Sequence, residues 1–271
     1  MNEIKIGNRV FDLKNHTYVM GILNVTPDSF SDGGMYMNTE SAFKRAVQMV
    51  NDGADIIDVG GESTKPGYTP VSAQEQIERV MPVIEEIKKK IDVPISIDTY
   101  NAEVAKEAVK NGCDIVNDIW ALHNAEGMAK VIADTHVVCV LMHNRVNPDY
   151  TDFRRDVLSD LSSYLDYAIL QGIEKEKIIL DPGIGFAKTY EQNLSTIHHI
   201  DDLKDLGCPI LMGTSRKSVI GLTLDLPIFE RVEGTIATTV IACMKGVNVV
   251  RVHDVRENVR AIRMTEAIMK A

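Results

Sequence analysis

The sequence predicts an α/β fold, a (β/α)8 TIM barrel that forms one domain over residues 1–271. From Tyr18 onward one pattern recurs eight times: a short apolar run, a polar residue at its end, and a segment with helical periodicity. No linker, low-complexity stretch or change of composition interrupts the 271 residues, and a barrel of this kind takes ~250 residues. An open doubly wound sheet is the alternative, but such sheets usually have fewer strands and a glycine-rich first turn, which is absent here.

The chain begins with a predicted β-hairpin over residues 3–13. Two alternating runs flank Gly7 and Asn8, a pair typical of a tight turn, and we expect this hairpin to close the bottom of the barrel. The eight barrel strands are expected at residues 18–23, 55–59, 94–97, 114–116, 136–141, 177–180, 209–211 and 248–252.

Amphipathic segments separate these runs, and a helix is expected over residues 39–52. Apolar side chains at helical spacing form one stripe of Ile77, Val80, Ile84 and Ile87, and a second stripe of Leu158, Leu161, Leu165, Ala168 and Ile169. Glycines follow several of these segments and precede a strand, as helix-terminating glycines do: Gly53, Gly112, Gly172 and Gly207.

Composition excludes several classes of protein. A net charge of −10 argues against general binding to nucleic acid or to an anionic membrane. No apolar run approaches the ~18 residues of a membrane span, and the N-terminus has no apolar signal core. The cysteines (Cys113, Cys139, Cys208 and Cys243) are far apart and form no CxxC pair, so we expect buried free thiols and a cytoplasmic location.

The stretch MGILNVTPDSFSDGG, residues 20–34, is the most informative part of the chain. A buried strand ends on Asn24, and Pro27, Asp28, Asp32 and the glycines that follow exclude a helix. A strand that delivers one amide at its tip and opens into a long loop is typical of a barrel active site.

Polar residues follow the other expected strands in the same way. In chain order the strand ends carry Asn24; Asp58, followed by residues 60–64; Asp98 and Thr99; Asn117 and Asp118; Met142, His143 and Asn144; Asp181; residues 213–218, GTSRKS; and Arg251, His253 and Asp254. Because the carboxyl ends of all barrel strands meet on one face, these residues predict a single site.

The chemistry of that site divides into two halves. Asp98, Asn117 and Asp181 offer acceptors and an amide, which suit the donor-rich edge of a flat, guanidine-like heterocycle. Lys217, Arg251 and His253, with Thr64 and the hydroxyls of residues 214–218, offer donors for an anion such as pyrophosphate or a carboxylate.

A magnesium site and several structural residues are also expected. Asn24, with Asp28 or Asp32 in reach, suits a Mg2+ ion bound mainly through a substrate phosphate. Asp118 and Asp254 are expected to cap helices, and His143 to hold its loop by a hydrogen bond. His198 and His199 are interpreted as structural, and DPGIGF lacks the spacing of a dinucleotide fingerprint.

Seven segments resemble successive signatures of the bacterial dihydropteroate synthase family. They are MGILNVTPDSFSDGG, DVGGESTKPG, ISIDTYN, VNDIW, LDPGIGF, GTSRKSVIG and RVHDV, in the family's order and from about Tyr18 to His253. The resemblance implies a TIM barrel of folate biosynthesis that joins 4-aminobenzoate to 6-hydroxymethyl-7,8-dihydropterin diphosphate with help from Mg2+, giving 7,8-dihydropteroate and pyrophosphate. It also implies a homodimer formed through the late helices.

The resemblance assigns roles to individual positions. It implies a pterin pocket of Asp98, Asn117, Met142, Asp181, Phe186, Lys217 and Arg251. It implies an aminobenzoate site of Phe30, Thr64, Pro66, Lys217 and Ser218, and a diphosphate and metal group of Asn24, Thr64, Arg251 and His253. Asp98, Lys217, Arg251 and His253 are the expected catalytic residues. One departure is Lys65, where many members have arginine, so the bidentate fork is lost.

Three alternatives compete with this reading. A methyltetrahydrofolate–corrinoid methyltransferase shares the acidic pterin end but has no use for the anion group around Lys217 and Arg251. A pterin-binding protein without turnover would be expected to lose loop residues such as Asn24, Phe30 or Asp32, which are present. A sulfonamide-insensitive synthase is the third, but GTSRKSVIG carries no insertion, so competitive inhibition by sulfonamides is expected.

Overall fold

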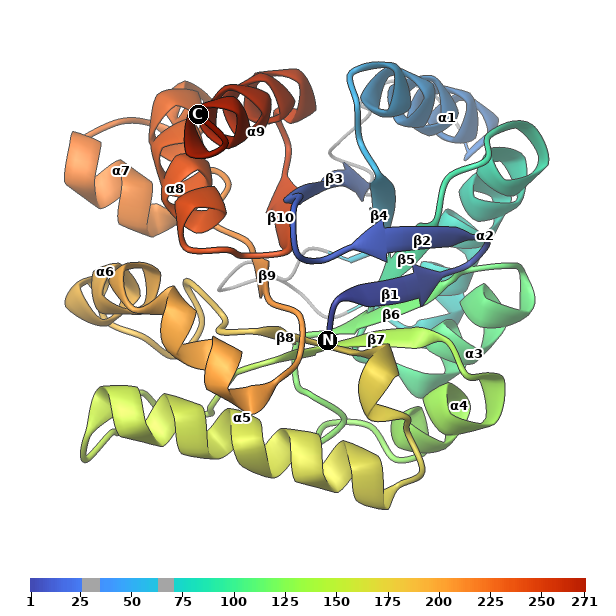
Figure 1. Ribbon diagram of the computed structural model, residues 1–271. Coiled ribbons are helices and arrows are strands. Elements are labelled where there is room, and N and C mark those ends of the chain that lie inside the picture. Colours follow the sequence, from blue (N-terminus) through green and yellow to red (C-terminus); the bar gives the residue numbers. More distant parts are fainter. Residues whose placement is uncertain (26–34, 63–70) are drawn as a thin grey trace.

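Eight parallel strands form a nearly closed barrel with helices around it (Figure 1). The computed structural model describes residues 1–25, 35–62 and 71–271, and of residues 35–38 only the backbone. The barrel strands are β3 (Tyr18–Asn24), β4 (Ile56–Gly60), β5 (Ile95–Asp98), β6 (Ile115–Asp118), β7 (Val138–Met142), β8 (Ile178–Asp181), β9 (Leu211–Met212) and β10 (Val249–Val252). The predicted (β/α)8 barrel is confirmed, and the open doubly wound sheet is wrong.

The strands follow one another around the barrel in the order β8-β7-β6-β5-β4-β3-β10-β9. The remaining seam lies between β8 and β9, where an isolated parallel bridge joins Leu180 to Ile210. The amide of Leu180 also donates a hydrogen bond of 2.9 Å to the carbonyl of Pro209. Because β9 is so short, this seam is the weakest part of the barrel wall.

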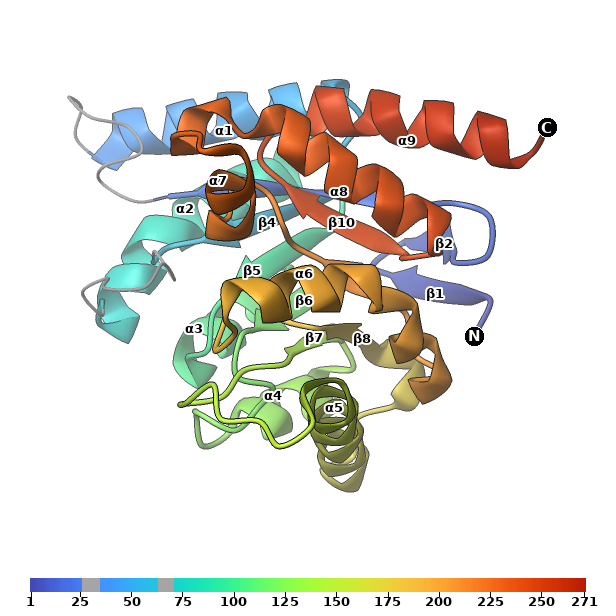
Figure 2. The same ribbon diagram turned by 90° about the vertical axis from the view of Figure 1, so that its left-hand side faces the viewer.

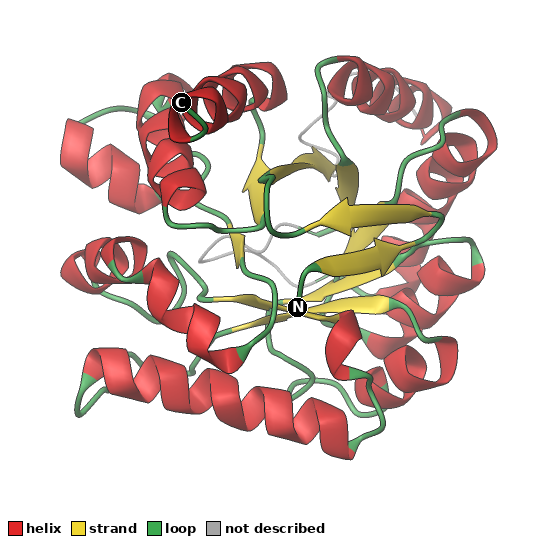
Figure 3. Cartoon of the chain, viewed as in Figure 1, coloured by secondary structure: helices red, strands yellow, loops and turns green. Residues whose placement is uncertain are grey.

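Helices alternate with the strands and cover the outside of the barrel (Figure 3). They are α1 (Met35–Asn51), α2 (Ala73–Lys90), α3 (Ala102–Lys110), α4 (Met128–Thr135), α5 (Phe153–Leu170), α6 (Tyr190–His198), α7 (Ser218–Leu224), α8 (Val232–Met244) and α9 (Val255–Met269), with short 3-10 helices η2 (Lys175–Lys177), η3 (Ile200–Leu206) and η4 (Ile228–Glu230). Helix α1 begins before the predicted residue 39. Helix α7 is an addition to the simple repeat, because both α7 and α8 follow β9.

The apolar stripes explain how two of the helices pack. Val80, Ile84 and Ile87 of α2 are fully buried, and Ile77 packs against the same core. On α5 the buried residues include Leu161, Leu165 and Ala168, and Leu158 is partly buried. The prediction for Ile169 is wrong, because its side chain is exposed; Val157 takes the buried position on that helix.

The predicted helix-terminating glycines all adopt the left-handed backbone conformation. The φ angles of Gly53, Gly112, Gly172 and Gly207 are +103°, +99°, +90° and +74°. A side chain is strained at such angles, which is the physical reason for glycine at these four turns from helix to strand.

The hairpin of β1 (Glu3–Ile6) and β2 (Arg9–Asp12) lies across one end of the barrel (Figure 1). Ile4, Ile6 and Phe11 pack on an apolar cluster inside the barrel. The barrel contributes Met20, Ile56, Ile115, Val138, Val140, Ile179, Leu211 and Val249 to that cluster. The predicted role of the hairpin, closing the bottom of the barrel, agrees with this packing.

We expect Phe11→Ala to lower the free energy of unfolding by about 3–5 kcal/mol, because the ring is 3% exposed and its removal leaves a cavity in the inner cluster. Urea unfolding followed by circular dichroism measures this. Val10→Ala is the matched control. The Val10 side chain, next to Phe11 in the sequence, is 62% exposed, so its truncation should change the free energy of unfolding by less than about 0.5 kcal/mol. Equal effects of the two substitutions would refute the sealing role of Phe11.

The four cysteines are free and buried, as predicted.

Among the described residues, none of the helices is both long enough and apolar enough to cross a membrane.

Candidate active site

A layer of polar side chains lies directly above the inner apolar cluster. Side chains alternate along each strand, so residues two apart both face the barrel interior. On β4, β6, β8 and β10 this places the pairs Ile56 and Asp58, Ile115 and Asn117, Ile179 and Asp181, and Val249 and Arg251, with the first of each pair in the apolar cluster. Figure 2 shows the hairpin and α7 at opposite ends of the barrel, so the polar layer faces the end away from the hairpin.

Arg251 joins two carboxylates of this layer. Its Nε donates to Asp58 Oδ2 and its Nη2 donates to Asp98 Oδ2, each at 2.6 Å. Asn117 Nδ2 donates to the same Asp58 oxygen at 3.3 Å. Burial alone would lower the pKa of Arg251, but the carboxylates of Asp58 and Asp98 raise that pKa above its ordinary value. The guanidinium therefore stays charged inside the barrel.

Asp98 keeps an oxygen available for a ligand. Its Oδ1 is buried and has no hydrogen-bond partner among the residues that the structure describes. The same is true of Asp58 Oδ1 on the neighbouring strand β4 and of Ser96 Oγ on β5 itself. Burial raises the pKa of Asp98 to about 7, and Arg251 opposes this rise. Buried polar atoms are costly without a partner, so this floor suits a ligand that brings N–H donors.

Asp181, Lys217 and Phe186 form the second half of the site. Asp181 Oδ1 accepts a hydrogen bond of 2.7 Å from the amide of Gly183. The amine of Lys217 donates to the carbonyl of Ile184 and lies 4.8 Å from the centroid of the Phe186 ring. Burial lowers the pKa of Lys217 to about 8, although the Asp181 carboxylate opposes this shift.

Met142 completes this wall. It is buried, and it pairs with Asp181 in the β7–β8 ladder. The two halves of the site interact, because the charges of Lys217 and Arg251 act on the ionisation of both Asp98 and Asp181. All seven residues of the predicted pterin pocket therefore lie in one part of the barrel.

His253 and Asn24 flank this pocket. His253 Nδ1 lies 2.9 Å from Ser215 Oγ, and the His253 amide donates to the same hydroxyl at 3.1 Å. Asn24 ends β3 beside Gly60: a Cβ added to Gly60 would lie 3.7 Å from Asn24 Oδ1 and 3.6 Å from Asp98 Cβ. The side chains of Asn24 and Asp98 therefore both lie next to Gly60.

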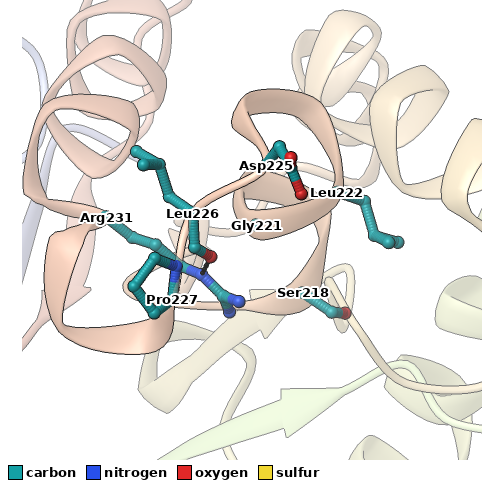
Figure 4. Close-up of a pocket in the computed structure, with 7 residues that line it drawn as sticks. All are labelled: Ser218, Gly221, Leu222, Asp225, Leu226, Pro227 and Arg231. Atoms are coloured by element: carbon teal, nitrogen blue, oxygen red, sulfur yellow. Dashed lines mark hydrogen bonds between the residues drawn. The ribbon is translucent and has the colours of Figure 1, made fainter.

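Ser218 is the first residue of α7 and lines a pocket of about 400 Å3 (Figure 4). Arg231 crosses this pocket and donates to the carbonyl of Leu226 at 3.0 Å. It also donates to the carbonyls of Arg216 and Lys217, at 3.0 and 3.3 Å. Arg231 thus fixes the turn that presents both Lys217 and Ser218.

Several predicted residues lie outside the described part of the chain. They are Phe30, Thr64 and Pro66 of the expected aminobenzoate and diphosphate sites, together with Asp28, Asp32 and Lys65.

Neither predicted helix cap is confirmed. The Asp118 carboxylate accepts hydrogen bonds from the amides of Trp120 and Leu122, but it holds a turn, because the next helix, α4, begins at Met128 with Gly127 as its N-cap. Asp254 stands at the start of α9 but makes no capping hydrogen bond, because its carboxylate pairs with Arg216. The capping role of Asp254 is therefore wrong.

Sequence reasoning missed the role of Asp58. Its place at a strand end was recognised, but nothing in the sequence linked it to Arg251, 193 residues away. It also gave no role to Ser96 or Lys188, and it did not link the Ser215 hydroxyl to His253. For Asp58 and Ser96 the only available signal was a polar side chain at a position that should face the interior of the barrel.

Known proteins resemble this chain over nearly its whole length. Residues 20–253 match the family model described as pterin binding enzyme. A dihydropteroate synthase of Clostridium beijerinckii is 54% identical over 268 residues, which cover 98% of this chain and 100% of the relative.

Solved structures agree with this match. A dihydropteroate synthase from Clostridium difficile, crystallised in the presence of pteroic acid, superimposes with a TM-score of 0.92 at 50% identity, over 98% of this chain and 99% of the other. The Yersinia pestis dihydropteroate synthase in a sulfonamide drug complex has a TM-score of 0.93 at 39% identity, over 99% of this chain and 100% of the other.

Proposed function

The chain belongs to the dihydropteroate synthase family of pterin-binding enzymes, and we propose that it condenses 6-hydroxymethyl-7,8-dihydropterin diphosphate with 4-aminobenzoate to give 7,8-dihydropteroate and pyrophosphate. One observation supports this most: buried carboxylates with an unpaired oxygen share the polar end of the barrel with Arg251, Lys217 and His253. A donor-rich heterocycle with an anionic tail is the ligand that matches both parts.

The pterin ring would occupy the floor. Its amino and ring N–H groups would donate to Asp98 and Asp181, and the Asn117 amide would accept or donate beside them. Phe186, Met142 and the Arg251 side chain would enclose the ring, and Lys217 would donate to its acceptor atoms.

The diphosphate would face Arg251, His253 and Asn24. Arg251 can neutralise charge on the departing oxygen, and His253 can donate to it, so both groups stabilise the leaving group as its negative charge grows. Loss of the diphosphate leaves a cationic methylene on an electron-rich dihydropterin, in an SN1-like step. The Asp98 carboxylate beneath the ring favours this cation electrostatically.

A Mg2+ ion fits this arrangement as an ion held mainly by the substrate. Asn24 offers one neutral amide oxygen beside Asp98, and no cluster of three or more acidic, histidine or cysteine ligands occurs among the described residues. Mg2+ commonly keeps most of its shell as water and phosphate oxygens. When bound, the ion would neutralise charge on the diphosphate.

The aromatic amine of 4-aminobenzoate would attack the methylene as the neutral species. This attack does not require an enzyme residue that acts as a covalent nucleophile. Its carboxylate would lie near Ser218 at the start of α7, where the turn is fixed by Arg231.

Pyrophosphate release by the purified protein tests this function, with the dihydropterin diphosphate and Mg2+ present and 4-aminobenzoate added or omitted. We expect release that depends on aminobenzoate, with dihydropteroate formed in equal amount, and competition by a sulfonamide against aminobenzoate. Pterin binding without turnover would instead support a binding protein. Absence of pterin binding would overturn the assignment of the strand ends.

We also propose a cytoplasmic homodimer. The four free thiols suit a reducing compartment. Exposed apolar side chains gather on the late elements: Leu222 on α7, Phe229 on η4, Met244 on α8, and Met264 and Ile268 on α9. Light scattering after size-exclusion chromatography should give a molar mass twice that of one chain, and Met244→Glu should lower the measured mass. A monomeric wild-type protein would contradict the proposed dimer.

A further inference from the structure

Lys188 is a partly buried residue whose amine the proposed reaction does not use. It follows the loop of residues 182–187, which runs from β8 to α6 and carries Phe186. Its Nζ lies 3.1 Å from the carbonyl of Gly183, 3.1 Å from the carbonyl of Phe186 and 2.9 Å from His143 Nδ1. All three contacts are to neutral groups, which is an unusual environment for a lysine.

Hydrogen-bond chemistry decides the direction of the contact with His143. The ring is fully buried, and its Nε2 lies 3.0 Å from Asp160 Oδ2. His143 and Arg145 lower the pKa of Asp160 to about 2, against the effect of burial, so this carboxylate is ionised and only accepts. His143 Nε2 must therefore carry the hydrogen. An ammonium at Lys188 can only donate, so His143 Nδ1 is the acceptor and the ring is neutral. Burial lowers the pKa of His143 and so favours the same neutral form.

The 182–187 loop is thus held from two sides. Lys217 contacts the carbonyl of Ile184 from within the site, and Lys188 binds the carbonyls of Gly183 and Phe186 from behind it. Gly183, at φ +69°, passes so close to the residue after β7 that an added Cβ would collide with the carbonyl oxygen of His143. The loop therefore has almost no freedom to shift toward His143.

We propose that Lys188 is a positioning residue for the pterin: its amine fixes the 182–187 loop so that Phe186 and the Lys217 contact stand ready for the ring. This inference rests on the proposed function. An ammonium has three hydrogens and meets three acceptors here, whereas a neutral amine has two. Burial lowers the pKa of Lys188 to about 7, and the charges nearby are Asp181, Lys217, Arg145 and Asp160. Binding is therefore best measured at about pH 6, where the ammonium predominates.

Lys188→Met keeps the length of the side chain but removes its donors. At about pH 6 we expect the Kd of the dihydropterin diphosphate alone, measured by calorimetry, to rise about 10- to 100-fold. In turnover the KM of that substrate should rise similarly, while kcat and the KM of aminobenzoate change less than about threefold. Tyr150→Phe is the matched control: it removes one hydrogen bond to the same loop, at the carbonyl of Ala187, and should weaken binding less.

Restoring the amine tests whether the donors themselves matter. Lys188→Cys should bind weakly, and alkylation with 2-bromoethylamine, which rebuilds an amine of lysine length, should recover most of the affinity. Wild type treated with the reagent controls for the other cysteines, which are buried. No recovery after confirmed alkylation would contradict the proposal.

A measurement on wild type keeps the proposal testable even where the variants fail to fold. Nitrogen-15 NMR of the histidine rings should show His143 with its hydrogen on Nε2, and His143→Gln identifies that signal. A hydrogen on Nδ1 would overturn the role of Lys188. Wild type that neither binds nor converts the pterin would refute the proposed function instead, whereas active wild type with normal pterin affinity in Lys188→Met would refute only this inference.

Discussion

Asp98→Asn is expected to lower kcat by about 100- to 1000-fold while changing the KM of the dihydropterin diphosphate much less. The asparagine keeps an acceptor for the pterin but loses the negative charge that stabilises the cationic methylene. Because that charge acts most strongly when the diphosphate departs, the loss falls on the rate and not on binding. Steady-state kinetics with both substrates varied measure the two constants.

The pH profile provides an internal control for this prediction. Burial raises the pKa of Asp98 to about 7, so the carboxyl is protonated below that pH and ionised above it. Wild-type kcat/KM should therefore fall as the pH drops through about 7, and Asp98→Asn should lack that fall. Asp118→Asn, which alters a carboxylate that holds the turn after the next strand, should keep kcat within about threefold. An unchanged kcat in Asp98→Asn would remove Asp98 from catalysis.

Arg251→Met should destabilise the fold as well as abolish activity. The guanidinium pairs with both Asp58 and Asp98, and its removal leaves two buried carboxylates without a counter-ion. Loss of one partner of a buried ion pair typically costs about 3–5 kcal/mol, so the urea midpoint should fall markedly. We expect kcat/KM to fall more than about 1000-fold, because the same side chain faces the departing diphosphate.

A second substitution separates these two effects. Adding Asp58→Asn to Arg251→Met removes one of the unpaired charges and should recover part of the lost stability but none of the activity. Arg256→Met controls for loss of an ordinary ion pair, since the Arg256 side chain is 51% exposed and its pair with Asp52 should contribute less than about 1 kcal/mol. A urea midpoint for Arg251→Met equal to that of Arg256→Met would contradict the buried-pair argument.

Much of the fold was accessible from sequence because its signals are local. A run of apolar residues that ends on a polar one predicts both a strand and which of its ends faces the site, and Asp98, Asn117 and Asp181 were found in that way. Glycines at turns, such as Gly172, were also predictable, because few residues other than glycine adopt a positive φ angle. Boundaries were less certain where a strand is short: β9 covers two residues, and the apolar run around it extends further.

The rest depends on contacts between distant parts of the chain. Ile169 continues the helical stripe of α5, yet whether it is covered depends on what packs beside the helix, and it is exposed. Asp58 and Lys188 are ordinary residues in the sequence; only folding shows that one binds Arg251 and the other faces His143. A periodic pattern gives the side of an element on which a residue lies, but not its partner.

The hairpin covers one end of the barrel, and the polar layer of the site faces the other end. Among the residues that the structure describes, Ile4, Ile6 and Phe11 fill the end that the hairpin covers, so we expect molecules to reach the polar floor from the opposite end. We therefore expect ordered binding: the dihydropterin diphosphate, which would lie deepest, should bind before 4-aminobenzoate, and pyrophosphate should leave before dihydropteroate. Dihydropteroate should consequently inhibit competitively against the dihydropterin diphosphate. We therefore expect the packing of three apolar side chains near the start of the chain to determine the order in which substrates bind and products leave.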